Sequence, residues 1–239
     1  MMNPTRSATP DEMMPVALLS GAASPWPALA EALLQAGYRL VWHSPLPLPP
    51  ALAAAPASRV CRVQADVHSE ATAQALLREV QQLWRRLDVL LLQPPQRPGL
   101  PLPEAVELEL AQRLGPLLAL TQAAVPLLRE QQGVVLWWLD QAVSRSHWLD
   151  GAVQAALPAT LRALAAELAP DVRLNAIQYP AAQLREGELN ELAHKRMVQK
   201  VAMKRPLREA DLVQAMHYLL QADFVTGHLL PVDGGGSVG

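Results

Sequence analysis

The chain has 239 residues, 51% of them hydrophobic, and a formal net charge of −2. This length suits one α/β domain with a sizeable core, and the small net charge gives no electrostatic reason to expect nucleic-acid binding. The single cysteine, Cys61, excludes a disulfide framework within the chain, and no apolar run is long enough to cross a membrane. We therefore expect a cytoplasmic protein that does not bind membranes, with a disordered tail over residues 1–14 and one domain over 15–239.

The segment 15–44 predicts a strand, a tight turn, a helix and a second strand. Val16–Leu19 is a short apolar run of the kind that forms buried parallel strands. Ser24 is expected to be the N-cap of the helix, and Gly37 is expected to end it. Tyr38–Trp42 then predicts the second strand, so the chain opens with the βαβ unit of a nucleotide-binding fold.

The rest of the chain continues this alternation of strands and helices. Further strands are expected over 59–64, 88–92, 133–139, 172–177 and 228–232. Helices are expected over 69–86, 104–130, 152–168 and 208–221, with a charged helical segment inside 181–205. Residues 44–58 carry five prolines between 45 and 57, which predicts a stiff connection without a regular helix. The pattern predicts the α/β fold class, as one Rossmann-like doubly wound parallel sheet of about seven strands flanked by helices.

Six sequence phrases, in order and at suitable intervals, resemble the short-chain dehydrogenase/reductase family, in particular its pteridine reductase and dihydromonapterin reductase type. The phrases are GYRLVWHS, VQADVHSE, LDVLLL, LALTQAAVPLLR, LAAELAPDVRLNAI and FVTGHLLPVDGGGS. The resemblance covers about residues 15–236. It implies the family's fold, and it implies a homo-oligomer, or a hetero-oligomer with a related reductase, formed through helix 152–168 and the last strand.

The first turn departs from the family's phosphate-binding motif, Thr-Gly-x-x-x-Gly-x-Gly. Ser20 and Gly21 remain, but the later glycine positions hold Pro25 and Pro27, and no glycine follows before Gly37. Proline has no N–H to donate to a phosphate, and its ring fills space that glycine leaves open. Ser20 and Gly21 are therefore only residual cofactor-binding positions.

Two other cofactor positions are tested in the same way. Asp66 and Val67 match the family's adenine contact, although Asp66 also suits a helix N-cap or a plain turn. The family's glycine-containing segments after the fourth and sixth strands read Leu92–Pro95 and Tyr179–Pro180 here. We therefore expect no cofactor, or NADPH if the chain is an active reductase.

The family's catalytic Tyr-x-x-x-Lys is missing from the whole chain, because none of the three tyrosines has a lysine four residues later. By register, the tyrosine and lysine positions fall on Asp150 and Gln154, the serine position on Asp140, and the asparagine position near Arg113. No catalytic residue of the family is intact. An aspartate at the position of Asp140 also occurs in pteridine reductases. Asp140, His147 and Asp150 form either a new acid/base set or a solvated polar loop.

Histidine and cysteine spacing predicts no metal site. Trp26, Trp42, Trp138 and Trp148 fall at or near the carboxyl ends of expected strands, where such sheets bind ligands. We hypothesise that these rings partly fill the cofactor cleft; the alternative is ordinary core packing.

Two functions remain open from the sequence. The first is a non-catalytic homologue, or pseudoenzyme, that binds, scaffolds or regulates a partner such as an active paralogue. The alternative is an NADPH-dependent oxidoreductase of the pteridine reductase type with a rebuilt active site.

Overall fold

The computed structural model describes residues 14–21, 25–65, 67, 69–94, 106–141, 148–184, 196, 198–199 and 201–238, with the side chains of 106–113 and 148–150 excepted. Its strands are β1 (Val16–Ser20), β2 (Arg39–His43), β3 (Val60–Val63), β4 (Val89–Leu92), β5 (Val134–Asp140), β6 (Arg173–Tyr179) and β7 (Leu229–Pro231). Its helices are α1 (Trp26–Gln35), α2 (Pro50–Ala53), α3 (Glu70–Trp84), α4 (Val106–Arg129), α5 (Trp148–Leu168), the 3₁₀ turn η1 (Ala181–Leu184) and α7 (Glu209–Gln221). The expected tail lies outside the described residues, apart from Met14.

The seven strands form one sheet in the order β3-β2-β1-β4-β5-β6-β7. Every pairing is parallel, from β2 with β3 to β6 with β7. The order reverses direction between β1 and β4, which is the topological switch point where open α/β sheets bind ligands. The expected doubly wound parallel sheet is confirmed.

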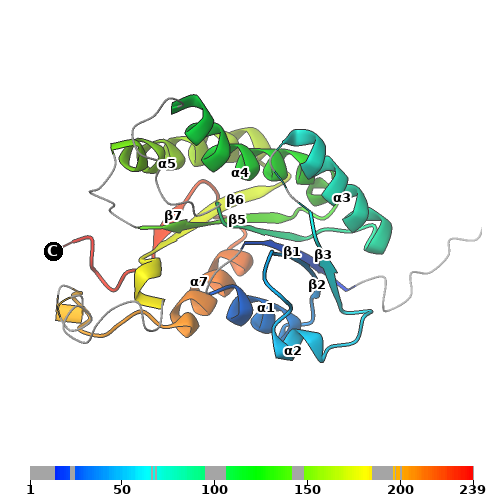
Figure 1. Cartoon of the computed structure of the whole chain (residues 1–239), viewed down its shortest axis with the longest axis horizontal. Helices are drawn as coiled ribbons and strands as arrows, with labels where there is room; N and C mark the ends of the chain where they lie inside the picture. Colours follow the sequence, from blue (N-terminus) through cyan, green and yellow to red (C-terminus); the bar gives the residue numbers. More distant parts are fainter. Residues whose placement is uncertain are drawn as a thin grey trace, which may run out of the picture.

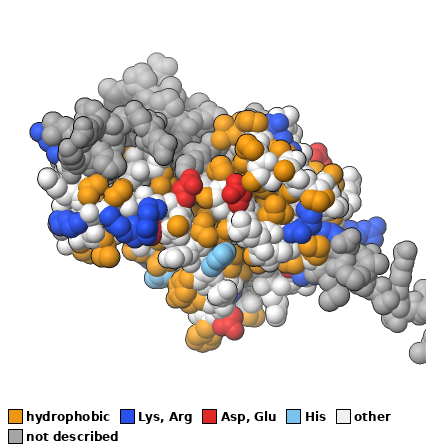
Figure 2. Space-filling view, turned by 90° about the horizontal axis from the view of Figure 1, so that it is seen from below, with side chains coloured by type: hydrophobic (Ala, Val, Ile, Leu, Met, Phe, Trp, Pro, Cys, Tyr) orange, Lys and Arg blue, Asp and Glu red, His pale blue; other side chains and the backbone are white. Residues whose placement is uncertain are grey.

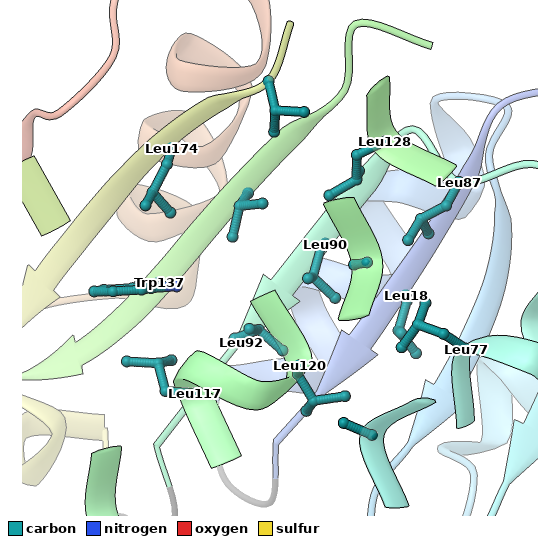
Figure 3. Packing of buried hydrophobic residues seen from close by; sticks show 14 of the residues in the cluster. Leu18, Leu77, Leu87, Leu90, Leu92, Leu117, Leu120, Leu128, Trp137 and Leu174 are labelled. Carbon is teal, nitrogen blue, oxygen red and sulfur yellow. The ribbon is translucent and has the colours of Figure 1, made fainter. Parts of the chain in front are cut away.

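Helices cover both faces of the sheet (Figure 1), with α3, α4 and α5 on one side and α1, α2 and α7 on the other. On the first side, strand residues such as Leu18 and Leu90 pack against Leu120 and Leu128 of α4 (Figure 3). On the second side, Leu29 and Leu33 of α1 pack with residues of α7 and the opposite strand faces. Strands buried on both faces explain the nearly unbroken apolar runs of the sequence.

Helix α3 follows its predicted amphipathic pattern closely. The Ser69 hydroxyl accepts from the Thr72 backbone N–H, and the Thr72 hydroxyl accepts from the Ser69 N–H, which closes a capping box. Leu76, Leu77 and Val80 are buried as expected. Leu83, in the last turn of the helix, is 43% exposed, although its spacing from Leu76 and Val80 predicts a place on the same face.

Several boundaries differ from the sequence prediction. A single helical turn, α2, forms in the proline-rich connection, because proline is tolerated at the start of a helix and Leu52 is buried there. Helix α4 starts two residues after the start of the expected helix 104–130, ends one residue before its end, and contains Pro116 and Pro126 as expected. Strand β5 includes Asp140, and α5 begins at Trp148, so the expected polar loop over 140–149 is shorter.

Helix α1 also begins differently from the prediction. Its first residue is Trp26, its N-cap is Pro25, and no side chain caps it. The predicted cap Ser24 lies outside the described residues, and the position it was assigned belongs to Pro25. The Pro25 carbonyl accepts from Leu29 N–H at 3.1 Å, so proline starts the helix without a side-chain cap.

The face formed by α1, α2 and α7 carries hydrophobic, basic and acidic side chains side by side (Figure 2). Among the described residues, no helix is both long and apolar enough to cross a membrane. Residues 185–195, 197 and 200 of the charged segment expected inside 181–205 lie outside the described part of the chain.

Candidate active site

The carboxyl ends of β1, β4, β5 and β6 lie along one edge of the sheet, beside the switch point. The first turn and the last residues of β5 and β6 therefore come together, although they are far apart in the sequence. This edge has two parts: an apolar half at the turn after β1 and a polar half at the ends of β5 and β6.

The apolar half is dominated by Trp26, the first residue of α1. A Cβ atom built on Gly21 would lie 1.3 Å from the indole Nε1 and 1.9 Å from Cε2. The ring therefore occupies the space directly above Gly21, where any larger residue would overlap it. Trp26 is only 1% exposed, so the indole is packed in place at the turn.

Trp26 belongs to a row of three buried aromatic rings. Its ring meets Trp138 edge to face at a centroid distance of 5.9 Å, and Trp138 meets Tyr179 in the same way at 6.0 Å. Edge-to-face pairs add about 0.5–1.5 kcal/mol to the burial of the rings themselves. Within the described residues, neither Trp26 Nε1 nor Trp138 Nε1 has a hydrogen-bond partner. Each buried, unpartnered N–H costs about 1–3 kcal/mol, so the row is well packed but polar atoms in it remain unsatisfied.

Trp26 lies beside Gly21 and Trp138 packs on Trp26, and both rings belong to one buried apolar cluster, so the hypothesis of cleft filling and the alternative of core packing both agree with their positions. Trp42 is also buried, but its Nε1 points to the Leu46 carbonyl oxygen at 3.4 Å, in the connection after β2. The side chain of Trp148 lies outside the described residues.

The end of β1 is tied to the end of β2 by a serine–histidine pair. The Ser20 hydroxyl lies 2.8 Å from His43 Nδ1, and His43 Nε2 lies 2.8 Å from the Ala65 carbonyl oxygen. Because a carbonyl only accepts, Nε2 carries a proton, and in the tautomer with Nδ1 unprotonated that nitrogen accepts from the Ser20 hydroxyl. The Gly21 N–H is also used, since it donates to the His43 carbonyl oxygen at 3.2 Å.

The polar half is organised around Asp140, the last residue of β5. Its Oδ1 accepts from the Ala181 N–H at 3.1 Å, which joins β5 to the turn after β6. Gln154 of α5 donates from Nε2 to the Asp140 carbonyl oxygen at 3.0 Å. Asp140 is partly exposed, so its carboxylate is held by neighbours and still reaches the surface of the edge.

A second carboxylate, Asp233, follows β7 and anchors the C-terminal turn. It is 7% exposed, accepts from Gln141 Nε2 at 3.0 Å, and accepts from the N–H groups of Gly235 and Ser237. Burial raises the pKa of this carboxyl, but these hydrogen bonds outweigh burial and leave the pKa below its usual value. Because Gln141 directly follows Asp140, its hydrogen bond to Asp233 connects the C-terminal turn to the end of β5.

A further link joins the two halves. Gln93, just after β4, donates from Nε2 to the Tyr179 hydroxyl at 3.2 Å. Tyr179 is completely buried and is the last ring of the aromatic row. This contact brings the segment after β4 beside the end of β6.

The predicted site residues are only partly brought together. Ser20 and Gly21 lie at the first turn, and Val67 packs toward the core beneath α3 and α4. Asp140 and Gln154 are direct neighbours, through a hydrogen bond from the Gln154 side chain to the Asp140 carbonyl oxygen. The other predicted positions cannot be compared in this way: Asp66 and His147 lie outside the described residues, and Arg113 and Asp150 lie in α4 and α5 with side chains outside them.

Sequence reasoning missed the Ser20–His43, Gln93–Tyr179 and Gln141–Asp233 contacts. Each contact joins polar residues at or just after the ends of strands, and that position was the available signal. Among the described residues, no group of three or more potential metal ligands comes together.

Comparison with known proteins identifies the family of the chain. A family model described as enoyl-(acyl carrier protein) reductase matches residues 27–237, most of the chain. The chain belongs to the short-chain dehydrogenase/reductase family. The dihydromonapterin reductase of Escherichia coli (strain K12) is 29% identical over 154 residues, 59% of this chain. Those residues are 60% of the relative, so the chain spans well under two thirds of the length of the curated relatives it matches.

Solved structures share the fold at lower identity. A 3-ketoacyl-(acyl-carrier-protein) reductase from Brucella melitensis, complexed with NADH, is 23% identical, with a TM-score of 0.70 over 93% of this chain and 98% of that one. ElxO, solved with NADP bound, is 17% identical, with a TM-score of 0.77 over 95% of this chain and 100% of that one.

These relatives overturn the prediction that no cofactor is expected. ElxO holds NADP and the Brucella reductase holds NADH, so relatives with this fold point to a nicotinamide cofactor. The prediction was wrong because it inferred the absence of a ligand from the loss of glycine donors alone. A lost donor shows that the usual contact is missing, and it does not show that every contact is missing.

The first turn does not fit a dinucleotide phosphate as it stands. The Trp26 indole covers Gly21, and the Gly21 N–H is already bonded to the His43 carbonyl oxygen. We therefore derive no chemical step through the cofactor from this geometry.

Proposed function

We propose that this protein is a nicotinamide-dependent reductase of the short-chain type that acts on a pteridine-like substrate through a rebuilt active site. Family membership over residues 27–237 and the relatives named dihydromonapterin reductase support the reaction class. The observation that carries the proposal is Asp140, a partly exposed carboxylate held at the carboxyl end of β5.

Asp140 suits both binding and proton handling. Pterins present a ring N–H beside an exocyclic amine, and a carboxylate accepts hydrogen bonds from both. Reduction of a dihydropterin adds a hydride and a proton across one C=N bond, so the site must also relay a proton. In the absence of Tyr-x-x-x-Lys, Asp140 is the described titratable group at the ends of β5 and β6 that reaches the surface.

Neighbouring residues hold Asp140 in position. Its Oδ1 is fixed by the Ala181 N–H, and its backbone is fixed by Gln154. Gln154 stands at the family's lysine position by register, and here it supports the strand end without carrying a charge. The Gln141–Asp233 bond places the C-terminal turn beside this end of β5.

The test is a steady-state assay of 7,8-dihydromonapterin reduction with NADPH and with NADH. We expect turnover that depends on Asp140, so that Asp140→Asn loses most of kcat/KM while its melting temperature stays near that of the wild type. Turnover that is unchanged in Asp140→Asn would reject Asp140 as the working group. No turnover with either cofactor would reject the proposed reaction.

A second candidate function rests on a different observation, the absence of Tyr-x-x-x-Lys from the entire sequence. In this case the protein is a non-catalytic family member that assembles with a related active reductase. Native mass spectrometry of the protein mixed with such a reductase tests it. A mixed oligomer with altered kcat supports the second candidate, and separate homo-oligomers together with intrinsic pterin reduction contradict it.

A further inference from the structure

We infer that Trp26 is a gate over the cofactor turn, so that a nicotinamide dinucleotide binds only after the indole has left the space above Gly21. This inference rests on the proposed function, because it names the residue that controls access to the cofactor site. It concerns Trp26 alone and does not involve Asp140.

The Trp26 ring and a phosphate compete for the same space at Gly21. The position of a Cβ atom on Gly21 is 1.3 Å from Nε1, 1.9 Å from Cε2 and 2.3 Å from Cζ2 of Trp26. Glycine at such a turn serves to let a phosphate approach the backbone. Here the indole has taken that approach space, so the ring and a phosphate cannot both lie against Gly21.

Burial and ring packing hold Trp26 in the closed position. Trp26 is 1% exposed, packs edge to face on Trp138, and lies in the apolar cluster that includes Leu29 and Leu33. These contacts favour the closed position. Cofactor binding must therefore spend part of its binding energy on moving the ring, which lowers the apparent affinity by the fraction of open molecules.

The indole N–H of Trp26 favours opening. Trp26 Nε1 is buried and has no acceptor among the described residues. A buried donor without an acceptor destabilises the closed position, and the N–H gains a water partner once the ring moves outward. The closed position is thus stabilised by ring packing and opposed by one unsatisfied polar atom, which is the balance that a displaceable side chain requires.

Calorimetric titration with NADPH and NADH tests the gate. Trp26→Leu removes the ring but keeps an apolar side chain, and we expect its dissociation constant to be about tenfold or more below that of the wild type. Trp137→Leu is the matched control, because Trp137 is an equally buried tryptophan in the cluster on the opposite face of the sheet. We expect this control to leave cofactor affinity unchanged.

Three outcomes overturn the gate. Equal affinity in the wild type and Trp26→Leu would show that the ring is no obstacle. Weaker binding in both Trp26→Leu and Trp26→Phe would make the indole N–H a cofactor ligand. A lack of binding in every folded variant would remove the site itself.

A second measurement keeps the inference testable if Trp26→Leu does not fold. NADP⁺ added to the wild type should move the tryptophan emission to longer wavelength and increase its quenching by acrylamide, and Trp26→Phe should lack this change. The same change in both proteins would overturn the gate.

The gate and the proposed function can fail separately. Tighter cofactor binding by Trp26→Leu without pterin reduction in any form would leave the gate standing and reject the reaction. Pterin reduction by the wild type with equal affinities in both proteins would do the reverse.

Discussion

The two halves of the active-site edge are built from opposite kinds of contact. From the turn after β1, Trp26 packs on Trp138 of β5, which packs on Tyr179 of β6, and two of the indole N–H groups lack partners among the described residues. At the ends of β5 and β6, the polar groups of Asp140, Gln141 and Asp233 are held by specific hydrogen bonds. The half at the first turn is covered by the Trp26 indole, and the half at the end of β5 carries hydrogen-bonded carboxylates.

This difference shows that motif loss along the chain is not uniform in its consequences. At the first turn, this chain has Pro25 and Pro27 where the family motif has glycines, and the Trp26 indole occupies the space next to Gly21. At the family's tyrosine and lysine positions this chain has Asp150 and Gln154, and Gln154 contacts Asp140 at the end of β5. The two halves can therefore be altered independently by substitution.

The largest expected effect is a loss of stability when Trp138, the middle ring of the aromatic row, is removed. Trp138→Ala removes a fully buried indole that contacts both Trp26 and Tyr179, so we expect the free energy of unfolding to fall by about 3–5 kcal/mol. Urea unfolding followed by circular dichroism measures it. Trp84→Ala is the control, because Trp84 is only partly buried, and its loss should be clearly smaller. A loss below about 1 kcal/mol for Trp138→Ala would show that the row does not support this half.

The next effect is on the polar half and on rate. Asp140→Asn keeps an oxygen for the Ala181 N–H but removes the charge, so we expect kcat/KM for pterin reduction to fall about 100-fold or more with little change in melting temperature. Asp171→Asn is the matched control, because Asp171 lies on the surface in an exposed ion pair with Arg129. Equal rates for the two variants would argue that Asp140 has only a structural role.

The pH dependence of stability tests the contribution of Asp233 to the polar half. Its pKa is lowered in the folded state, so its stabilising contribution is complete above the ordinary carboxyl pKa and is lost as the pH falls through the lower, folded value. We expect Asp233→Asn to cost about 1–2 kcal/mol near pH 7 and to unfold with a weaker pH dependence down to about pH 3. Urea midpoints measured across this range provide the test, and parallel curves for wild type and variant would contradict it.

The smallest effect is expected at the serine–histidine pair that closes the apolar half. Ser20→Ala removes the donor to His43 Nδ1, and we expect a loss of about 1 kcal/mol in the free energy of unfolding. Ser58→Ala, at an exposed position in the connection before β3, should change stability negligibly. No difference between the two variants would show that the 2.8 Å contact contributes nothing net.

The sequence predicted the sheet and most helices because both signals are local. Apolar runs such as Val89–Leu92 mark buried parallel strands, and Ser69 with Thr72 marks the start of α3. The start of α1 was mistaken because Ser24 is a better N-cap by residue type than Pro25. Residue preference is a weak guide where burial of Trp26 decides how the helix starts.

The site was predictable only in part. The family register assigned Asp140 and Gln154 to the serine and lysine positions, and four tryptophans were predicted at or near the carboxyl ends of strands. That Trp26 would lie on Gly21 while Trp42 turned to Leu46 depends on side-chain packing across strands, which sequence spacing does not encode. The cofactor prediction failed for a related reason, because a missing motif says little about how a remodelled cleft binds.

The central claim is that the dinucleotide half of this edge is closed by Trp26 and opens for the cofactor. Fluorine NMR of protein labelled with 5-fluorotryptophan tests it directly, with the Trp26 resonance assigned by its loss in Trp26→Phe. On titration with NADPH, we predict that the Trp26 signal moves toward the solvent-exposed position and shifts more than the signal of buried Trp137. A Trp26 signal that stays in place while NADPH binds would contradict the account.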